Sequence, residues 1–523
     1  MLRTERKGSA WCIAPVMVCL AGTASASVTI SAAPTSSMNC AAGVCAPTAS
    51  SANLNTTDLQ TMLAAGDVKV TTGSSANDID VADAVTWAST HRLTLQAQHS
   101  LAIDAVVAVE GTAALTLVTN HGGSGGTFSF GAPGRIDFWD VHSKLKINGL
   151  AYKLVGDMKA LIRLALATPA GAYAMAKDFA LHGVYGSAPI ALFEGRFDGL
   201  GHMVSGMRIR ARNDSNIGMF GDAAGWIGHL HITGATIAHG NYAGILAGSN
   251  YGVIDGVTAD GLFVEVANVG GIAGTSNNTI ENSSGTVRIK GHATQTLGGV
   301  AAENTGLIDR SHGTLAAGPA VTLAGGLVAR ADAGSRITNS SGNVDTIANA
   351  TAGGLAGVNF GSISGSYASG MAESFNDEDS EAGGLVANNQ GSIVDCYATT
   401  AVKALGRDTG GAAGGLVGLN YGTIATSYAI GTAIAGNLNQ NGGGLIGGDH
   451  ATNGVSASYW DMDTSGITNP SQGASDPAND PGITGLTDTQ LKSGLPSGFS
   501  ASIWGQSAGI NNGDPYLLAN VPQ

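Results

Sequence analysis

Short apolar clusters recur along the chain from about residue 217 onward, and each is built on a glycine followed by aliphatic side chains. Nine such glycines follow one another at intervals of 26 to 31 residues. A second row of aliphatic residues, nearly all isoleucine, runs in phase with the first. Self-similarity at a near-constant period of this length is typical of repeat architectures. The two rows are Gly218, Gly244, Gly271, Gly299, Gly326, Gly354, Gly384, Gly415 and Gly444, and Ile254, Ile280, Ile308, Ile337, Ile363, Ile393, Ile424 and Val455.

An asparagine or aspartate lies between the two rows in each repeat, usually close to a glycine. These residue types tolerate left-handed backbone angles and hydrogen-bond locally, so the position predicts a tight corner between two short strands. The Gly-Gly pairs and β-branched residues disfavour a helical solenoid, and helical 3.6-residue spacing is absent. We therefore expect an all-β parallel β-helix, in which each coil pairs with the next about 4.8 Å away. The corner residues are Asn250, Asn277, Asn304, Asp332, Asn359, Asn389, Asn420 and Asp449.

One short helix is predicted outside the repeats, over residues 157–167. Met158, Leu161, Ile162 and Ala165 recur there at helical spacing, and Asp157 can serve as the N-cap. We interpret this helix as a cap or excursion packed against the solenoid, because an open β-helix end needs covering to prevent edge pairing.

The last repeats contain a sharper strand motif, Ser-Tyr-Ala or a close variant. We interpret its tyrosines as an aromatic ladder that packs between successive coils, in preference to a platform for carbohydrate stacking. Cys396 takes the serine position of this motif and is expected to be a small structural residue. Cys40 and Cys45 are close enough to form one small disulfide in an oxidising compartment. The tyrosines are Tyr367, Tyr397, Tyr428 and Tyr459.

Composition agrees with one elongated array. Of 523 residues, 79 are glycine and 13 are proline, 43% are hydrophobic and 12% are charged. This composition favours short strands and tight turns around a hydrophobic core, and it disfavours collagen and proline-rich disorder. The formal net charge of −14 disfavours nucleic acid as a partner, because phosphate neutralisation needs a basic surface.

The first residues are typical of a secretory signal, with a basic start, an apolar run over residues 11–22 and a small-residue cleavage site at residues 24–26. No later stretch approaches the roughly 20 apolar residues of a membrane helix. We therefore expect a protein that is secreted or held at the outer cell surface. The predicted segments are a signal peptide (1–26), a low-complexity linker (27–52), a β-strand region (53–155), a helix-containing connection into the solenoid (156–216), the solenoid repeats (217–466) and a carboxy-terminal cap or tail (467–523).

The repeat at residues 414–429, Gly-Gly-Leu-Val-Gly-Leu-Asn-Tyr-Gly-Thr-Ile-Ala-Thr-Ser-Tyr-Ala, resembles the GLUG motif of filamentous haemagglutinin-like exoproteins and some bacterial surface proteases. Residues 197–202, 458–466 and 485–491 are similar to flanking segments of that group, and residues 53–155 look like its strand-rich passenger. The resemblance implies a secreted bacterial adhesin with a right-handed parallel β-helical shaft.

No residue is assigned a catalytic, cofactor-binding or metal-binding role, and no cofactor is expected. The proteases that carry these repeats use a zinc-binding His-Glu-x-x-His helix, and none of the 12 histidines lies in such a motif. No Gly-x-Ser-x-Gly elbow with plausible partners stands out either. His229 and His231 alternate on one strand but lack a third ligand, so we interpret them as surface residues.

Two acidic stretches are interpreted as structural. The run at residues 461–466 imitates the start of a calcium-binding EF-hand loop, but its twelfth position is Gln472 where that loop needs glutamate. The other stretch lengthens one repeat and is predicted to be a solvated excursion, although such a loop could bind calcium. Its members are Glu373, Asp377, Glu378, Asp379 and Glu381.

The leading hypothesis is a non-enzymatic, adhesin-like structural protein that contacts unidentified glycans or proteins on host or bacterial surfaces. Two alternatives stay open: a polysaccharide-active β-helix enzyme, either a lyase or a glycosidase, and an autoaggregation scaffold without a dedicated ligand. The enzyme hypothesis requires carboxylates within about 10 Å of one another on consecutive coils along a groove.

Overall fold

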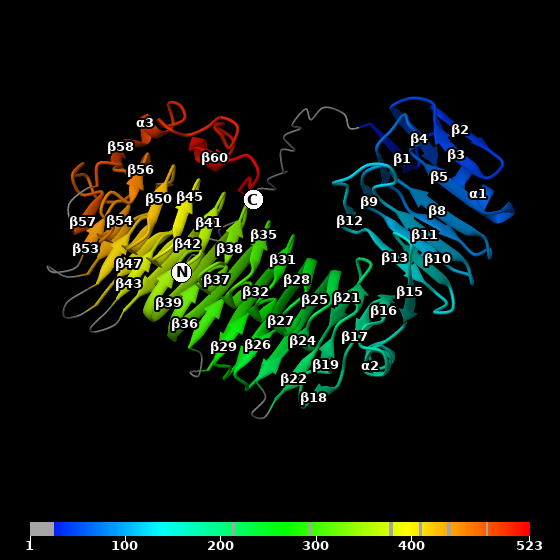
Figure 1. Ribbon diagram of the computed structural model, residues 1–523, viewed down its shortest axis with the longest axis horizontal. Coiled ribbons are helices and arrows are strands. Elements are labelled where there is room, and N and C mark those ends of the chain that lie inside the picture. The colour runs from blue at the N-terminus through cyan, green and yellow to red at the C-terminus, as the bar shows by residue number, and fades with distance from the viewer. Residues whose placement is uncertain are drawn as a thin grey trace, which may run out of the picture.

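The computed structural model describes residues 26–211, 215–291, 295–375, 380–406, 411–436, 441–476 and 480–522. Over these residues the chain forms two β-solenoid arms that meet at an elbow and give the molecule the outline of a U (Figure 1). Most strands pair in parallel with the equivalent strand of the next coil, so the predicted fold class, an all-β parallel β-solenoid, is confirmed. The predicted signal peptide up to residue 25 and residues 377–379 of the acidic stretch lie outside the described residues.

The amino-terminal arm has three sheet faces around one apolar interior. Inward and outward positions alternate along its strands: Leu145 is buried while its neighbours Lys144 and Lys146 are exposed. This period of two is the pattern of a strand with one face on a core. The sheets contain β12 (Phe128–Phe130), β9 (Leu101–Ile103), β6 (Asp78–Val81), β1 (Ser27–Ser31) and β4 (Ser51–Asn55); β7 (Val85–Trp87), β10 (Val106–Val109) and β13 (Arg135–Phe138); and β5 (Val68–Thr71), β8 (Arg92–Gln96), β11 (Ala114–Val118), β14 (Lys144–Ile147) and β15 (Leu150–Val155).

Residues 27–52, predicted to be a linker, instead begin the solenoid. Strand β1 lies between β4 and β6 in its sheet, and its Val28 and Ile30 are fully buried. Strands β2 (Met38–Ala41) and β3 (Val44–Pro47) form a hairpin that the Cys40–Cys45 disulfide closes. The small polar residues of this stretch concealed the apolar alternation that places β1 on the core.

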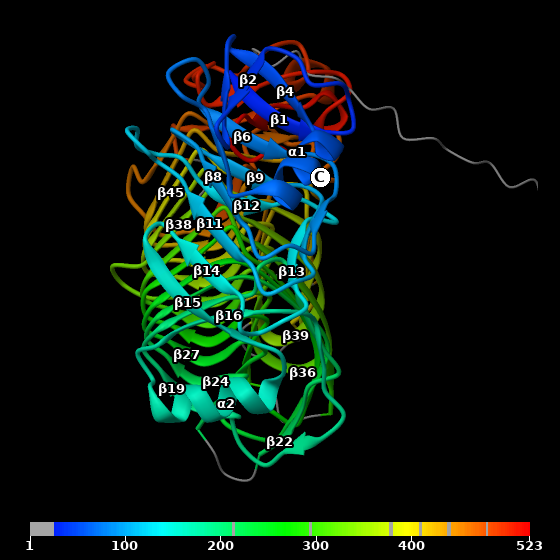
Figure 2. The same cartoon turned by 90° about the vertical axis from the view of Figure 1, so that its right-hand side faces the viewer.

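The predicted helix is present as α2 (Met158–Ala167), and Asp157 caps it by accepting a hydrogen bond from the Ala160 N–H at 2.7 Å. Its buried Leu161 belongs to the core of the carboxy-terminal arm, and Figure 2 shows the helix across the near end of that arm. The expectation of a single helix is wrong, because α1 (Thr56–Ala65) and the short α3 (Asp488–Leu491) are also present. Helix α1 buries Leu59 and Leu63, one turn apart, against the amino-terminal arm.

The carboxy-terminal arm carries the repeats, and its isoleucine row is in register as predicted. Ile254 pairs with Ile280, and Ile280 with Ile308; the row continues through each coil to Val455. Its members are at most 5% exposed. The strands of this row are β25 (Trp226–Ala238), β28 (Val253–Val264), β31 (Thr279–Glu281), β35 (Leu307–Asp309), β38 (Arg336–Thr338), β41 (Ser362–Ser364), β45 (Ser392–Val394), β50 (Thr423–Ala425) and β55 (Val455–Ser456).

The glycine row marks where successive coils approach most closely. A Cβ atom added to Gly354 would collide with the carbonyl oxygen of Gly384 in the next coil, and the same holds for Gly384 against Gly415. A side chain at these positions would therefore separate the coils. This contact explains why glycine recurs at the period of the solenoid.

The asparagines predicted to form left-handed corners have a different role. None of them has a positive φ among the described residues, and Asn359, Asn389 and Asn420 are fully buried. Asn359 Nδ2 donates to Asn389 Oδ1 at 2.8 Å, and Asn389 Nδ2 donates to Asn420 Oδ1 at 2.8 Å. The side chains thus form a buried amide ladder that satisfies its own polar groups. Asn277 and Asp332 lie one residue beyond this row, which Ser276 and Ala331 occupy. The sheet with this row contains β19 (Ile190–Phe193), β24 (Phe220–Ala223), β27 (Ala247–Asn250), β30 (Ala273–Ser276), β34 (Ala301–Asn304), β37 (Val328–Ala331), β40 (Ala356–Asn359), β44 (Val386–Asn389), β49 (Val417–Asn420), β54 (Ile446–Asp449) and β57 (Ala474–Asp476).

The tyrosine ladder packs between coils, as predicted. The ring centroids of Tyr367 and Tyr397 are 5.0 Å apart and those of Tyr397 and Tyr428 are 5.2 Å apart, with planes tilted by 11° and 8°. The carboxy-terminal segment folds back over these rings, with the Trp504 ring centroid 5.8 Å from that of Tyr428. The ladder is therefore covered and offers no aromatic platform. Its strands are β42 (Tyr367–Ser374), β46 (Tyr397–Ala398), β51 (Tyr428–Ala429) and β56 (Ser458–Asp461).

Substitution of an inward leucine tests the stacking. Leu416 is fully buried, so Leu416→Asp places an unpaired carboxylate in the core and should lower the free energy of unfolding by at least about 3 kcal/mol. Val394→Asp, at a side chain that is 37% exposed, is the matched control and should change stability by less than about 1 kcal/mol. Urea unfolding measures both, and equal effects would contradict the inward orientation.

Candidate binding cleft at the elbow

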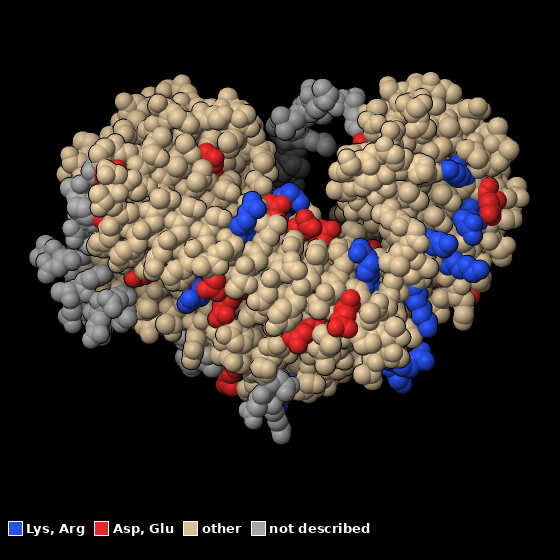
Figure 3. Space-filling view, in the orientation of Figure 1, with Lys and Arg blue, Asp and Glu red and all other residues tan. Residues whose placement is uncertain are grey.

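A cleft of about 570 Å³ opens where the two arms meet. The amino-terminal arm contributes Phe128 and Tyr152 to its lining, and the carboxy-terminal arm contributes Trp226, His229 and Asp255. Figure 3 shows the hollow between the arms, with acidic and basic side chains gathered at its base. Its lining extends along one corner of the carboxy-terminal arm as far as Asn282.

Three carboxylates lie along that corner on consecutive coils. Asp255 pairs in register with Glu281, and Glu281 pairs with Asp309. Paired strands lie about 4.8 Å apart, so neighbouring members of the row meet the spacing that the enzyme hypothesis requires. We call Asp255, Glu281 and Asp309 the acidic row.

Backbone turns after each strand set the direction of the acidic row. The next residue has a left-handed conformation in each coil, with φ of 64° at Gly256, 50° at Asn282 and 45° at Arg310. Non-glycine residues adopt this conformation at an energetic cost and persist in it where their surroundings hold them. The solenoid thus repeats one sharp corner and presents the side chains beside it at a fixed spacing.

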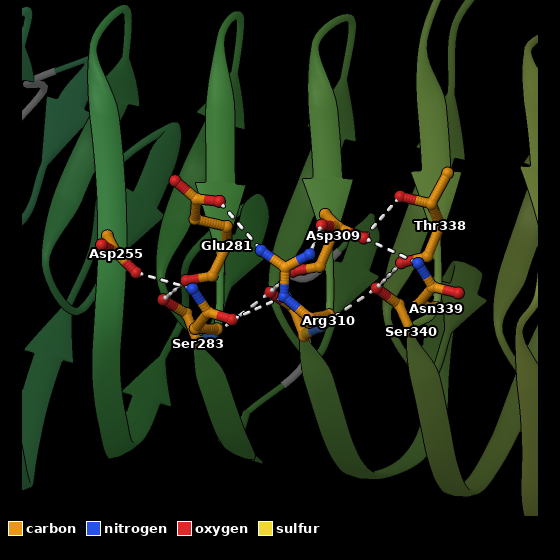
Figure 4. A network of polar contacts seen from close by, with 10 residues as sticks. Asp255, Glu281, Ser283, Asp309, Arg310, Thr338, Asn339 and Ser340 are labelled. Atoms are coloured by element: carbon orange, nitrogen blue, oxygen red, sulfur yellow. Dashed lines mark hydrogen bonds and ion pairs between the residues drawn. The ribbon is translucent and has the colours of Figure 1, made fainter. Parts of the chain in front are cut away.

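Arg310 and Asn282 join the acidic row into one polar network (Figure 4). The Arg310 guanidinium contacts the carboxylate of Asp309 and lies 3.2 Å from Glu281 Oε2. Its Nε donates to Asn282 Oδ1 at 2.8 Å, while Asn282 Nδ2 donates to Asp255 Oδ1 at 2.8 Å. One cation and one amide therefore bridge three stacked carboxylates.

The central carboxylate of the row, Glu281, has a shifted pKa. Burial raises the pKa of Glu281 above its ordinary value, the charges of Asp255 and Asp309 raise it further, and Arg310 opposes them. Like charges on neighbouring coils disfavour the ionised form, which is the physical cause of the second contribution. The Glu281 carboxyl therefore takes up a proton more readily than an ordinary glutamate does.

A row of buried hydroxyl groups supports the corner from within. Ser311 Oγ accepts a hydrogen bond from the Ser283 N–H at 3.3 Å and donates to the Asp309 carbonyl oxygen at 2.9 Å. Cys396 occupies one position of the row, is fully buried and unpaired, and burial raises the pKa of its thiol to about 12. It is a small structural residue, as predicted. The row comprises Ser283, Ser311, Ser340, Ser366, Cys396, Ser427 and Ser458.

The carboxy-terminal segment covers the same corner beyond the acidic row. Asn520 Nδ2 donates to the carbonyl oxygens of Ser340 at 3.0 Å and Gly365 at 3.2 Å, and Trp504 Nε1 donates to Asp395 Oδ1 at 3.2 Å. The acidic row thus occupies the stretch between the elbow cleft and this covering segment.

An aromatic and cationic wall bounds the cleft at the elbow. The Arg196 guanidinium carbon lies 4.4 Å from the ring centroid of Trp226, a cation–π arrangement. Arg196 Nε donates to the hydroxyl of Tyr152 at 3.0 Å. Because Tyr152 belongs to β15 and Arg196 to β20 (Arg196–Asp198), this contact also links the two arms.

His229 joins the arms through both ring nitrogens. Nδ1 lies 3.1 Å from Asp198 Oδ1, and Nε2 lies 3.0 Å from the carbonyl oxygen of Phe128 in the other arm. Both partners are acceptors, and an imidazole can donate to two acceptors only in its doubly protonated form. Burial lowers the pKa of His229, but the charge and hydrogen bond of Asp198, with smaller contributions from Asp255 and the Phe128 carbonyl, outweigh it and raise that pKa above its ordinary value.

His202 repeats this arrangement one coil earlier. Its Nδ1 lies 3.0 Å from Asp178 Oδ1, and its Nε2 lies 2.8 Å from the carbonyl oxygen of Ile136 in the amino-terminal arm. The hydrogen bond from His202 also lowers the pKa of Asp178, which keeps that carboxylate ionised as an acceptor. Two buried histidines thus hold the backbone of one arm against carboxylates of the other.

The prediction of surface positions is confirmed for His231 and wrong for His229. His231 is exposed, but the His229 side chain is 9% exposed and holds the elbow. The contact joins residues 101 positions apart, so local strand alternation gave no sign of it.

The two acidic stretches remain outside the cleft residues. Glu373 forms an ion pair with Lys403 at 3.4 Å, and Asp461 is buried with Oδ1 accepting from the Asp463 N–H at 2.8 Å. Across the described part of the chain, no three His, Cys, Asp or Glu side chains are grouped to hold a metal ion. None of the helices in that part has the length and apolar character that a bilayer crossing requires.

The acidic row escaped the sequence analysis, although a signal for it exists. Each carboxylate directly follows an isoleucine of the predicted row, so the column after that row reads Asp255, Glu281 and Asp309. Stacking of one column implies stacking of the next, which would have grouped these residues.

Known proteins match this chain over part of its length. No family model matches it. Halomucin of Haloquadratum walsbyi (strain DSM 16790 / HBSQ001) is 33% identical over 99 residues, which cover 18% of this chain and 1% of halomucin. A solved structure of IgA1 protease aligns with 57% of this chain and 24% of its own length, at 16% identity and a TM-score of 0.31. The matched regions span far less than two thirds of either relative.

His229 at the elbow should make the stability of the fold depend on pH. Because the folded pKa of His229 lies above its ordinary value of 6.5, its contribution to stability is complete below about pH 6.5 and is lost as the pH rises through the folded pKa. The free energy of unfolding should then fall by about 1.5 to 3 kcal/mol, the typical contribution of a hydrogen bond to a charged group, as the pH rises through the folded pKa.

Urea unfolding at several pH values measures this effect. His229→Gln should reduce the decrease, whereas the exposed control His231→Gln should keep it. An unchanged pH profile in the His229→Gln variant would show that this histidine does not link protonation to folding.

Proposed function

We propose that this chain is an adhesin-like structural β-solenoid, secreted or held at the outer cell surface, which binds glycans or proteins of host or bacterial surfaces. The observation that carries the proposal is the acidic row, which begins at the elbow cleft with Asp255 and runs toward the stretch of the same corner that the carboxy-terminal segment covers. In this proposal the acidic row binds a ligand and catalyses no reaction.

The chemistry of the corner supports this proposal. Only 12% of the residues are charged, yet three carboxylates, one guanidinium and one amide are concentrated on three adjacent coils. Such a row offers hydrogen-bond acceptors and donors to a partner with repeated hydroxyl or amino groups. The groups stand on rigid strands, which reduces the ordering entropy that binding must overcome.

Two further features support the location and the family. The Cys40–Cys45 disulfide is typical of oxidising, extracytoplasmic compartments, and the first residues are typical of a secretory signal. We also propose kinship with filamentous haemagglutinin-like exoproteins, on the basis of the GLUG-like repeat at residues 414–429.

A binding comparison tests the proposal. The purified chain is applied to glycan arrays, matrix proteins and whole cells, beside an Asp255→Asn/Glu281→Gln double variant. The control, Asp345→Asn/Glu194→Gln, removes two exposed carboxylates outside the acidic row. We expect the double variant to bind at least about tenfold more weakly, equivalent to about 1.4 kcal/mol, and the control to bind like the wild type.

If both variants bind equally weakly, the loss of binding is due to net charge and not to the acidic row. If all three proteins bind equally well, the acidic row does not contact the ligand.

A second candidate function, a glycan-active enzyme, is favoured by the in-register carboxylates and by the raised pKa of Glu281, which suits a general acid. Release of new reducing ends from a bound glycan by the wild type, but not by Glu281→Gln, would replace the binding proposal with this one.

A further inference from the structure

One face of the amino-terminal arm carries positive charge without negative charge. The strands β5, β8, β11, β14 and β15 contain five Lys or Arg residues and no Asp or Glu. In Figure 3, most charged side chains visible on this arm are Lys or Arg. This segregation stands out in a chain of net charge −14. We call the five residues the basic row: Lys69, Arg92, Lys144, Lys146 and Lys153.

The solenoid register arranges the basic row in lines. Lys69 pairs with Thr94, Thr94 with Thr116, and Thr116 with Lys146, while Arg92 reaches Lys144 through Ala114. At about 4.8 Å per strand, the first line places its charges about 14 Å apart and the second about 10 Å apart. The threonines add hydroxyl groups between the charges of the first line.

The charges of the basic row are available to a partner. Lys69 is half-buried and the other four are exposed. The ion pairs found across the described residues involve other Lys and Arg side chains. The acid beside this face, Asp67, accepts a hydrogen bond from the backbone N–H of Arg92 at 2.8 Å.

We propose that the basic row is a second binding surface, distinct from the elbow cleft, and that it binds a linear acidic polysaccharide. Charges set in lines across one sheet match an extended chain with repeated anionic groups, and the threonine hydroxyls match its sugar hydroxyls. Single-stranded nucleic acid is held by exposed aromatic platforms, and interfacial membrane anchoring uses Trp or Phe. The exposed aromatic side chains of the described residues, Trp139, Tyr251, Phe375 and Tyr421, all lie off these five strands.

The test uses polygalacturonate as the probe, with neutral dextran as its uncharged counterpart, at increasing salt. If all five cations engage, affinity should fall roughly 100-fold between about 50 and about 200 mM salt. The double variant Lys69→Thr/Lys146→Thr replaces both charges of the first line with threonine, the residue that the two strands between them carry. It should lower the slope of log affinity against log salt concentration by about 1.4. Lys159→Gln/Arg163→Gln removes two exposed charges on α2 and should keep the wild-type slope.

Circular dichroism confirms that each variant is folded before binding is compared. The proposal is overturned if polygalacturonate does not bind at low salt, if dextran binds equally, or if the two double variants behave alike. It is also overturned if a single-stranded oligonucleotide or phosphatidylglycerol vesicles bind more tightly than polygalacturonate. Because the acidic row is intact in both variants, failure here leaves the cell-surface binding proposal to its own test.

Discussion

The close stacking of each coil on the next in strict register is the constraint on which the carboxy-terminal arm depends. At the glycine row the backbones approach so closely that a Cβ on Gly354 would collide with the carbonyl oxygen of Gly384. With the coils held at strand spacing, several columns of side chains contact their own kind. Isoleucines stack on isoleucines inside, asparagines bond to asparagines, and Tyr397 stacks between Tyr367 and Tyr428. The packing and the hydrogen bonding thus both follow from the same in-register stacking, repeated in each coil.

The same register explains both the acidic row and its partial compensation by neighbouring donors. A column that holds carboxylates in consecutive coils must bring like charges together, which is unfavourable unless other groups compensate. Here Arg310 and Asn282, in the next column, supply the donors. Beyond this stretch the column changes to Thr338, Ser364 and Val394, and the carboxy-terminal segment covers the corner. A polar surface can therefore be confined to a few coils without interrupting the solenoid.

The repeats were predictable from the sequence because their signals are local and periodic. The isoleucine row, the tyrosine ladder, the structural role of Cys396 and helix α2 all follow from spacing or from a matched position in the repeat. Strand β1 was missed because small polar residues obscured its short alternation, and α1 because Leu59 and Leu63 lie within a strand-rich stretch. The elbow had no local signal, since Phe128 and His229 belong to different arms and meet through side chains far apart in sequence.

Hydrogen–deuterium exchange of the purified chain, with and without the surface material it binds, tests whether the acidic row is the contact surface. If the acidic row is the contact surface, exchange should slow in the backbone around residues 255–256, 281–282 and 309–310, with little change at the equivalent corners beneath the carboxy-terminal segment. Protection that spares these three corners and appears elsewhere on the solenoid would contradict it.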